Sequence, residues 1–321
     1  MRILAIDGGG MRGLIPAVVL AELERRTGRR TAELFDLIAG TSTGGILACG
    51  LTRPAADGSG RPAFTAADLI GLYESEGPEI FHRSLLKRSS VVDGYVNERY
   101  DDTGLNAALG RYLDGTRLSD AVTDVFITAY EIERRQAFFF RSARARTDPT
   151  YDFTFVDAAR ATAAAPTYFE PARVRDVAEA ETYALIDGGV FALNPAMCAY
   201  AEVAAAGGAG EIDLVVSLGT GSHTRPLHHV DVQGWGQLEW ARPLVDVVFD
   251  GVAQTVDFEL GQLMPEGRYV RLQTALTDAS DDIDDASDDN LEALRRQGTR
   301  LVEERSADLD RIASALAVAG S

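Results

Sequence analysis

Ser42 is the residue whose surroundings most clearly predict chemistry. It stands at the centre of a G-x-S-x-G sequence, with Gly40 and Gly44 two positions to either side. An apolar run at residues 34–39 precedes this sequence and another at 46–51 follows it, which predicts a strand, a sharp turn and a helix. The serine hydroxyl projects from such a turn, and the glycines let strand and helix pass closely. Ser42 is therefore the candidate nucleophile, and a glycine-rich helix start without chemistry is the alternative interpretation.

A second glycine cluster lies near the start of the chain. Residues 7–13, with the sequence DGGGMRG, follow an apolar run and precede a helical pattern. Backbone N–H groups in such a loop bind negative charge, on a phosphate or on a developing oxyanion. The candidate oxyanion loop consists of Gly8, Gly9, Gly10, Arg12 and Gly13. Their spacing also fits a dinucleotide-binding motif, but Asp36 comes too late to bind a ribose and lies inside its expected strand, so we disfavour that interpretation.

Asp187 is the candidate base. It ends the apolar run at residues 183–186 and precedes Gly188 and Gly189. Open α/β sheets place their sites at the ends of strands, so a carboxylate held there can reach a ligand. An aspartate before two glycines is also a common turn former, which is the alternative. Only folding can bring Asp187 close to Ser42.

Taken together, residues 7–13, 40–45 and 187–189 resemble the three motifs of the patatin-like phospholipase family in sequence, order and spacing. Further similarity lies in AAPTYFEP at 164–171, in the Asn-Pro pair at 194–195 and in SLGTG at 217–221. The resemblance covers the chain from its start to about residue 225. One departure is the sequence ATAA at 161–164, where many relatives carry serines.

This resemblance implies an α/β fold, namely a modified α/β-hydrolase-like three-layer sandwich with a mostly parallel central sheet. It also implies a serine acyl hydrolase of the phospholipase A or lysophospholipase type, which acts on lipid acyl esters through a Ser42–Asp187 dyad without a cofactor. A carboxylate desolvated by its pocket has a raised pKa and can accept the serine proton. Arg12 would steady the glycine loop or meet a lipid phosphate, and a structural salt bridge is the alternative.

Other mechanisms and functions stay open at this stage. A Ser–Asp–His triad would use one of three histidines after Asp187, but their polar, proline-containing stretch favours exposed loop residues. These histidines are His223, His228 and His229. His82 is interpreted as a surface or lid residue. An acyltransferase would use the same acyl-enzyme. A cyclic-nucleotide-activated effector of anti-phage defence, similar to bacterial members of the family, would bind its nucleotide beyond residue 225.

Composition limits the partners. The chain has 321 residues, 46% apolar content and a formal net charge of −18. This charge argues against binding to a nucleic acid polymer and gives no long-range attraction to anionic membranes, so any transient membrane contact must be local and apolar. Cys49 and Cys198 are too few for a disulfide framework, and no metal-ligand spacing occurs. Met1 runs directly into an expected strand, and we expect a cytoplasmic protein.

Hydrophobic periodicity predicts alternating strands and helices. Strands are expected near residues 2–6, 35–39, 124–132, 136–141, 182–186, 212–217 and 268–272. Helices are expected near residues 15–26, 43–52, 66–75, 103–113, 154–163, 195–206, 240–261, 288–304 and 307–318.

The expected organisation is a catalytic domain at 1–275, an acidic linker at 276–289 and C-terminal helices at 290–321 that pack on the same domain. Residues 278–289 hold seven aspartates. They lack the glycine and glutamate of a calcium-binding loop, so we expect a solvated linker. Residues 77–100 mix apolar and basic side chains. They form either a flap that touches lipid through Phe81, Leu85 and Leu86, or a plain packed connection.

Overall fold

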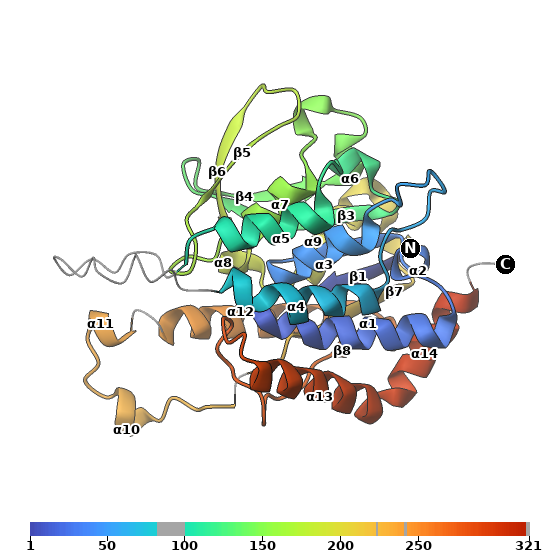
Figure 1. Cartoon of the computed structure of the whole chain (residues 1–321). Helices are drawn as coiled ribbons and strands as arrows, with labels where there is room; N and C mark the ends of the chain where they lie inside the picture. The colour runs from blue at the N-terminus through green and yellow to red at the C-terminus, as the bar shows by residue number, and fades with distance from the viewer. Residues whose placement is uncertain (82–99, 223, 241–242, 319–321) are drawn as a thin grey trace.

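The structure is a computed structural model of the whole chain. It describes residues 1–81, 100–222, 224–240 and 243–318 (Figure 1). Most of the expected flap, including Leu85 and Leu86, lies outside the described residues, as do His82 and His223. Within the described ranges, no helix is long and apolar enough to cross a membrane.

Eight strands of the described chain form one sheet, in the order β5-β6-β3-β2-β1-β7-β8, with β4 paired to β3 off this path. They are β1 (Arg2–Ile6), β2 (Leu37–Gly40), β3 (Asp124–Glu131), β4 (Gln136–Arg141), β5 (Ala172–Arg175), β6 (Thr182–Asp187), β7 (Leu214–Leu218) and β8 (Tyr269–Leu272). The strands from β3 through β2, β1 and β7 to β8 are parallel, and β4, β5 and β6 pair antiparallel to their neighbours.

The parallel register brings the predicted motifs to one edge of the sheet. Ile6, the last residue of β1, pairs with Gly40 of β2 and with Leu218 of β7. Because parallel strands end at the same edge, the loops that follow them lie side by side. The glycine loop at 7–13 therefore emerges beside the turn that carries Ser42.

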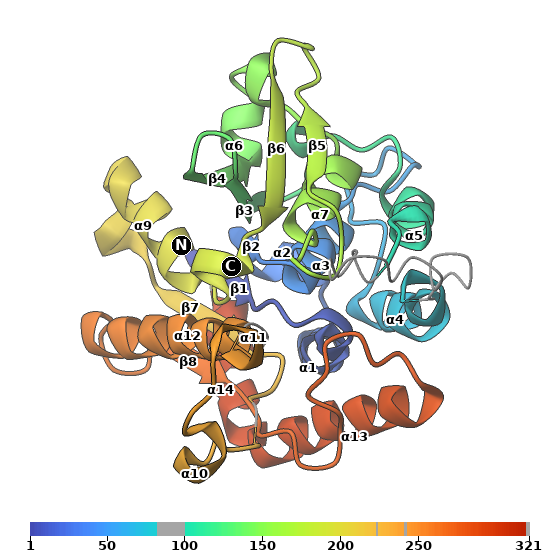
Figure 2. The same ribbon diagram turned by 90° about the vertical axis from the view of Figure 1, so that its left-hand side faces the viewer.

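Helices cover both faces of the sheet, as Figure 2 shows. They are α1 (Leu14–Thr27), α2 (Thr31–Leu34), α3 (Thr43–Thr52), α4 (Ala66–Ile80), α5 (Thr103–Leu113), α6 (Ser142–Ala145), α7 (Phe155–Thr162), α8 (Gly189–Ala192), α9 (Ala196–Val203), α10 (His229–Val232), α11 (Gln237–Trp240), α12 (Pro243–Leu263), α13 (Asp288–Glu304) and α14 (Ser306–Val318). Helices α1, α3, α4, α5 and α7 lie on one side of the sheet, and α9 and α12 lie on the other. Helix α13 packs on the outside of α1.

Strand β1 shows how the two layers are built. Side chains alternate across a strand, so Ile3 and Ala5 face the core under α9 and α12, and Leu4 and Ile6 face the larger core under α1 and α3. All four side chains are fully buried. The result is a three-layer sandwich around a mostly parallel sheet, which confirms the predicted fold class.

All seven expected strands are present, but the prediction missed β5. Ala172 and Val174 of this strand are buried while Arg173 and Arg175 are exposed, so its alternation is correct but only four residues long. Helix α4 was expected to end near residue 75, and it instead continues to Ile80 with Pro78 in its last turn. Proline lacks an N–H, so Pro78 cannot donate the helical hydrogen bond to the Glu74 carbonyl oxygen, and the last turn of α4 lacks that bond.

The segment expected to be a solvated acidic linker is partly buried. The carbonyl oxygen of Ile283 accepts a hydrogen bond from the Met11 N–H at 2.9 Å. Asp284 is buried and accepts a hydrogen bond from the Tyr100 hydroxyl at 2.7 Å. The expectation of solvent exposure is therefore wrong for these two residues, because the segment folds back onto the glycine loop.

Candidate active site

Ser42 lies in a strained turn between β2 and α3. Its φ and ψ angles of 53° and −123° are rare for a residue with a side chain, and such strain is typical of functional turns. A side chain on Gly44 would clash with the carbonyl oxygen of Ile6, and one on Gly40 would clash with Gly44 itself. The two glycines thus let β2, α3 and the end of β1 meet, as the motif predicted. The Ser42 N–H donates to Thr162 Oγ1 at 2.8 Å, a contact that the sequence did not suggest.

Asp187 reaches the same place from the end of β6. Its side chain is buried, and its Oδ1 accepts the N–H of Gly189 at 2.7 Å. Burial raises the pKa of Asp187 to about 7, and the hydrogen bonds from Gly189 and from the Ser42 hydroxyl oppose this rise to a smaller extent. The structure therefore brings together the two residues that the sequence singled out, and it gives the carboxyl a pKa near neutrality.

The glycine loop passes next to Ser42. A Cβ placed on Gly8 would lie 3.2 Å from the Cβ of Ser42. The N–H of Gly8 donates to the Leu193 carbonyl oxygen at 3.0 Å, and that of Met11 donates to Ile283. Among the hydrogen bonds of the described residues, none uses the N–H of Gly9 or Gly10. Gly10 also lines the same pocket as Ser42, so these two amides are the candidate oxyanion donors.

Arg12 is buried directly beneath this loop. Its Nε donates to the Gly9 carbonyl oxygen at 3.3 Å. Burial lowers the pKa of the Arg12 guanidinium, and the nearby carboxylates of Asp246, Asp250 and Asp281 oppose that effect. The contact with Gly9 favours the role of steadying the loop. Gly13 follows, where a side chain would clash with Thr43 and Tyr73.

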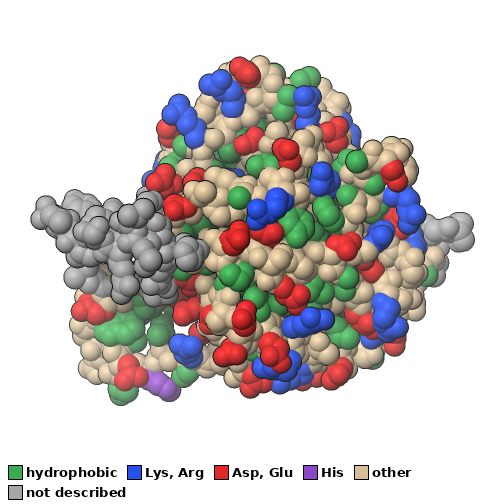
Figure 3. All heavy atoms as spheres, in the orientation of Figure 1, with side chains coloured by type: hydrophobic (Ala, Val, Ile, Leu, Met, Phe, Trp, Pro, Cys, Tyr) green, Lys and Arg blue, Asp and Glu red, His purple; other side chains and the backbone are tan. Residues whose placement is uncertain are grey.

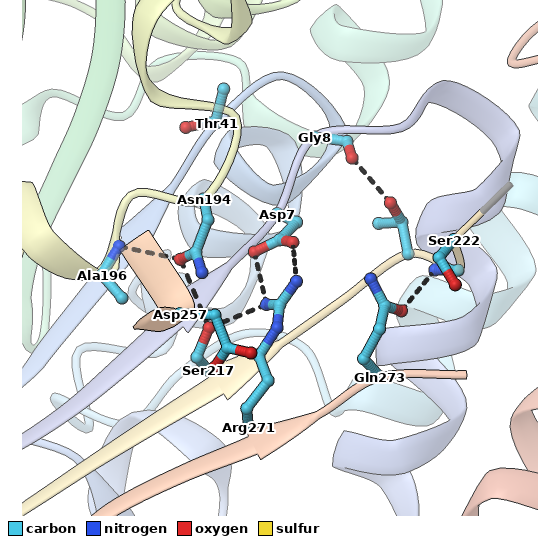
Figure 4. A network of polar contacts seen from close by, with 12 residues as sticks. Asp7, Gly8, Thr41, Asn194, Ala196, Ser217, Ser222, Asp257, Arg271 and Gln273 are labelled. Atoms are coloured by element: carbon cyan, nitrogen blue, oxygen red, sulfur yellow. Dashed lines mark hydrogen bonds and ion pairs between the residues drawn. The ribbon is translucent and has the colours of Figure 1, made fainter. Parts of the chain in front are cut away.

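A buried polar network supports the glycine loop from below (Figure 4). Both carboxylate oxygens of Asp7 accept hydrogen bonds from Arg271 of β8, at 2.9 and 2.5 Å, and Arg271 also donates to Ser217 Oγ at 2.8 Å. Thr220 Oγ1 donates to the Gly8 carbonyl oxygen at 2.6 Å. The SLGTG sequence, which contains Ser217 and Thr220, supports the family resemblance, but its sequence alone predicts no role for either residue. Nothing in the sequence paired Arg271 with Asp7.

An apolar pocket opens at Ser42. Its lining is mainly hydrophobic. It comes from the glycine loop, α3, α4, α5, the segment after α7 and residues 276–289, which we call the acidic segment. The lining residues are Gly10, Met11, Ser42, Thr43, Ile46, Leu72, Tyr73, Gly77, Ile80, Phe81, Leu105, Ala163, Ala165, Tyr168, Phe169 and Ile283. A pocket of this character accepts a hydrocarbon chain, and the Ser42 hydroxyl belongs to its lining. Phe81, expected to touch lipid from a flap, lines this pocket instead.

Two of the three histidines considered for a triad, His228 and His229, do not line this pocket, and His223 lies outside the described residues. His228 and His229 are exposed at the start of α10. The described residues also hold no group of three or more histidine, cysteine, aspartate or glutamate side chains arranged to bind a metal ion. Cys49 is buried and Cys198 partly buried, and neither forms a disulfide.

An open α/β sheet with an apolar pocket and a serine beside a buried carboxyl is the arrangement that a serine acyl hydrolase requires. Comparisons with known proteins identify the family. The sequence model described as "Patatin-like phospholipase" matches residues 4–200. The chain is 37% identical to Patatin-like protein 2 of Arabidopsis thaliana, over 94% of this chain and 82% of that protein. It is 30% identical to Patatin-15 of Solanum tuberosum, over 94% and 83%.

The chain therefore belongs to the patatin-like phospholipase family, and it is a lipid acyl ester hydrolase. Among solved structures, it is similar to VipD from Legionella pneumophila, with a TM-score of 0.39 and 12% identity over 94% of this chain and 67% of that chain.

Proposed function

We propose that Ser42 and Asp187 form a catalytic dyad that hydrolyses acyl esters of lipids, with Gly9 and Gly10 as oxyanion donors. The observation that carries the proposal is that the Ser42 hydroxyl lies close enough to the buried Asp187 carboxyl to lower its pKa, beside an apolar pocket. A carboxyl with a pKa of about 7 is ionised in an appreciable fraction of molecules at neutral pH, and it binds a proton far more strongly than an ordinary aspartate.

In the first half of the reaction, Ser42 Oγ forms a bond to the ester carbonyl carbon while its proton passes to Asp187. The carbonyl electron pair moves onto oxygen, where the N–H groups of Gly9 and Gly10 stabilise the negative charge. The tetrahedral intermediate collapses, the bond to the alcohol breaks, and Asp187 returns the proton to that leaving group.

Water completes the reaction. It attacks the acyl-enzyme carbonyl while Asp187 accepts one of its protons. The bond to Ser42 then breaks and the proton returns to Ser42 Oγ, which releases a fatty acid. The apolar side chains around the pocket hold the hydrocarbon chain, and they leave the serine as the polar group at its end.

The test is replacement of the nucleophile. Ser42→Ala keeps a Cβ in the same turn and removes only the hydroxyl, so turnover should fall about 10⁴-fold or more while the melting temperature is unchanged. The measurement is fatty acid release from phospholipids, lysophospholipids, neutral glycerides and acyl thioesters. Ser75→Ala, which removes a hydroxyl from the exposed face of α4, is the matched control and should retain full activity. Turnover by Ser42→Ala comparable to the native chain would refute the proposal.

A further inference from the structure

The large apolar side chains that are exposed on the described surface all belong to one stretch of the chain. They are Leu227, Val230, Leu244, Val247, Val248, Phe258 and Leu263. Single exposed apolar residues need no explanation, but exposed apolar residues that lie next to one another mark an interaction surface. Figure 3 shows apolar side chains gathered beside a histidine at the lower left, where Figure 1 places α10 and α11.

The first half of α12 carries the part of this stretch that adjoins the active site. Leu244, Val247 and Val248 are spaced three and four residues apart, so they share one face of the helix. The ring of Phe249 lies 3.5 Å from the position of a Cβ on Gly189, two residues after Asp187. The beginning of α12 therefore lies beside the catalytic pair.

The hollow beside the exposed face adjoins the acyl pocket. Val247 and Leu227 line a hollow together with Tyr168 and Ile283. Tyr168 and Ile283 line the pocket at Ser42 as well. An acyl chain that leaves a lipid surface at Leu227 and Val247 would thus reach the pocket at Ser42 past Tyr168 and Ile283, which line both. We call the set Leu227, Leu244, Val247 and Val248 the rim patch.

Charge decides which kind of lipid surface fits the rim patch. The described lining of the same hollow contains Asp246, Asp250, Asp281 and Asp282, and Arg225 in this lining pairs with Asp281 at 2.8 Å. The buried Arg12 also lies close to Asp246, Asp250 and Asp281. The chain as a whole has a net charge of −18. This net negative charge repels an anionic bilayer, whereas a zwitterionic phospholipid presents a cationic ammonium group outermost.

We propose that the rim patch is the docking surface for a zwitterionic phospholipid aggregate and that it feeds acyl chains into the pocket at Ser42. This inference rests on the proposed function, because docking would deliver substrate to Ser42. Docking itself can be measured without turnover. Apolar contact supplies the affinity, and the net negative charge of the chain selects against anionic lipid.

The experiment measures co-sedimentation with vesicles in the non-hydrolysing Ser42→Ala background. Vesicles of phosphatidylcholine alone are compared with equal mixtures of phosphatidylcholine and phosphatidylglycerol. Leu244→Ser with Val248→Ser should weaken partitioning onto phosphatidylcholine by about tenfold or more, because two apolar contacts are lost. Leu227→Ser is a second, independent variant and should act in the same direction.

The matched control lies on the same helix. Phe258→Ser with Leu263→Ser removes two side chains that are 68% and 60% exposed, but Phe258 stands 14 positions after Leu244, about 20 Å along the helix. This variant should bind vesicles like its parent. Phosphatidylglycerol should weaken binding at low salt, and added salt should restore it by screening the repulsion. With Ser42 intact, the rim variant should hydrolyse a soluble short-chain ester within about twofold of the native rate.

Each alternative result is decisive. Undiminished vesicle binding by both rim variants, equal loss in the control, or tighter binding to phosphatidylglycerol would overturn the proposal. A change of oligomeric state in the rim variant, seen by sedimentation, would show instead that the patch binds a second copy. If the native chain binds vesicles through the patch but releases no fatty acid from any ester, the docking proposal stands and the proposed function fails.

Discussion

The floor and the mouth of the candidate active site are built in different ways. The floor consists of the ends of β1, β2, β6 and β7, where Asp7 and Asp187 are buried and held by hydrogen bonds. The mouth consists of α12 and the acidic segment, where apolar side chains such as Leu244 are half exposed. Under the proposed function, the floor would fix the reacting groups and the mouth would select the substrates that reach them.

The largest effect that can test this division is expected at Asp187. Asp187→Asn keeps the size of the side chain but cannot accept the serine proton, so kcat should fall about 10³-fold or more. In the native chain, acyl-enzyme formation should rise with pH through about 7, because the base must be ionised. Pre-steady-state release of the alcohol as a function of pH measures this step.

The exposed histidines provide the control for that experiment. His228→Ala and His229→Ala should each lower kcat by less than about tenfold, as expected for residues outside the reaction. A loss at either histidine as large as that at Asp187 would replace the dyad with a triad.

The pH dependence of stability provides a second test of Asp187. The folded pKa of Asp187 is raised above its unfolded value, so its contribution to stability is present below about pH 4 and lost as the pH rises through 7. Asp187→Asn should therefore gain thermal stability relative to the native chain as the pH increases over this window.

The floor was largely predictable from the sequence, because its residues lie at strand ends that local patterns reveal. The apolar run before Gly40 and the glycines around Ser42 predict the turn, and the run before Asp187 predicts a strand that ends there. The two parallel strands then bring the loops together by a general property of such sheets. Strand β5 was not predicted, because an alternation of buried and exposed positions over only four residues cannot be distinguished from chance.

The mouth was not predictable in the same way, because it depends on contacts between distant segments. Seven aspartates in twelve residues favour a solvated linker, yet Ile283 within them binds the glycine loop through its backbone. A backbone hydrogen bond leaves no trace in residue type. The ion pair of Asp7 and Arg271 could not be predicted for a related reason. Charge alone does not tell which of the 31 lysine and arginine residues pairs with a given carboxylate.

The next largest effect is expected on the free energy of unfolding, at the buried pair of Asp7 and Arg271. Arg271→Met leaves the Asp7 carboxylate buried without its main partner, which should lower the free energy of unfolding by about 3–5 kcal/mol. Burial already raises the pKa of Asp7, so the loss should be greater at pH 8 than at pH 5, where protonation relieves the unpaired charge. Chemical denaturation at the two pH values measures both quantities.

An exposed ion pair supplies the comparison for Arg271. Arg296 pairs with Glu292 on the surface of α13, and Arg296→Met should change stability by less than about 1 kcal/mol. Adding Asp7→Asn to Arg271→Met should recover part of the lost stability, because it removes the unpaired charge. If both arginine variants cost the same, the pair beneath the glycine loop is not the structural support that we infer.

The smallest predicted effect concerns the mouth, where Tyr100 holds the acidic segment in place. Its hydroxyl donates to the buried Asp284, next to the residue whose carbonyl accepts the Met11 N–H. Tyr100→Phe should lower the free energy of unfolding by about 1–3 kcal/mol, because a buried acceptor loses a donor. Tyr112→Phe is the matched control, since the described hydrogen bonds include none from its hydroxyl.

The kinetic consequence of Tyr100→Phe distinguishes the two regions. The reacting groups on the floor are held by strands that this substitution leaves intact, so kcat on a short-chain ester should stay within about threefold of the native value. The acyl pocket is lined by Ile283, which the Tyr100 contact helps to fix, so KM for long-chain esters should rise. A fall in kcat on both substrates, as large as that for Asp187→Asn, would show that the mouth also fixes the reacting groups, and the division between the two regions would be wrong.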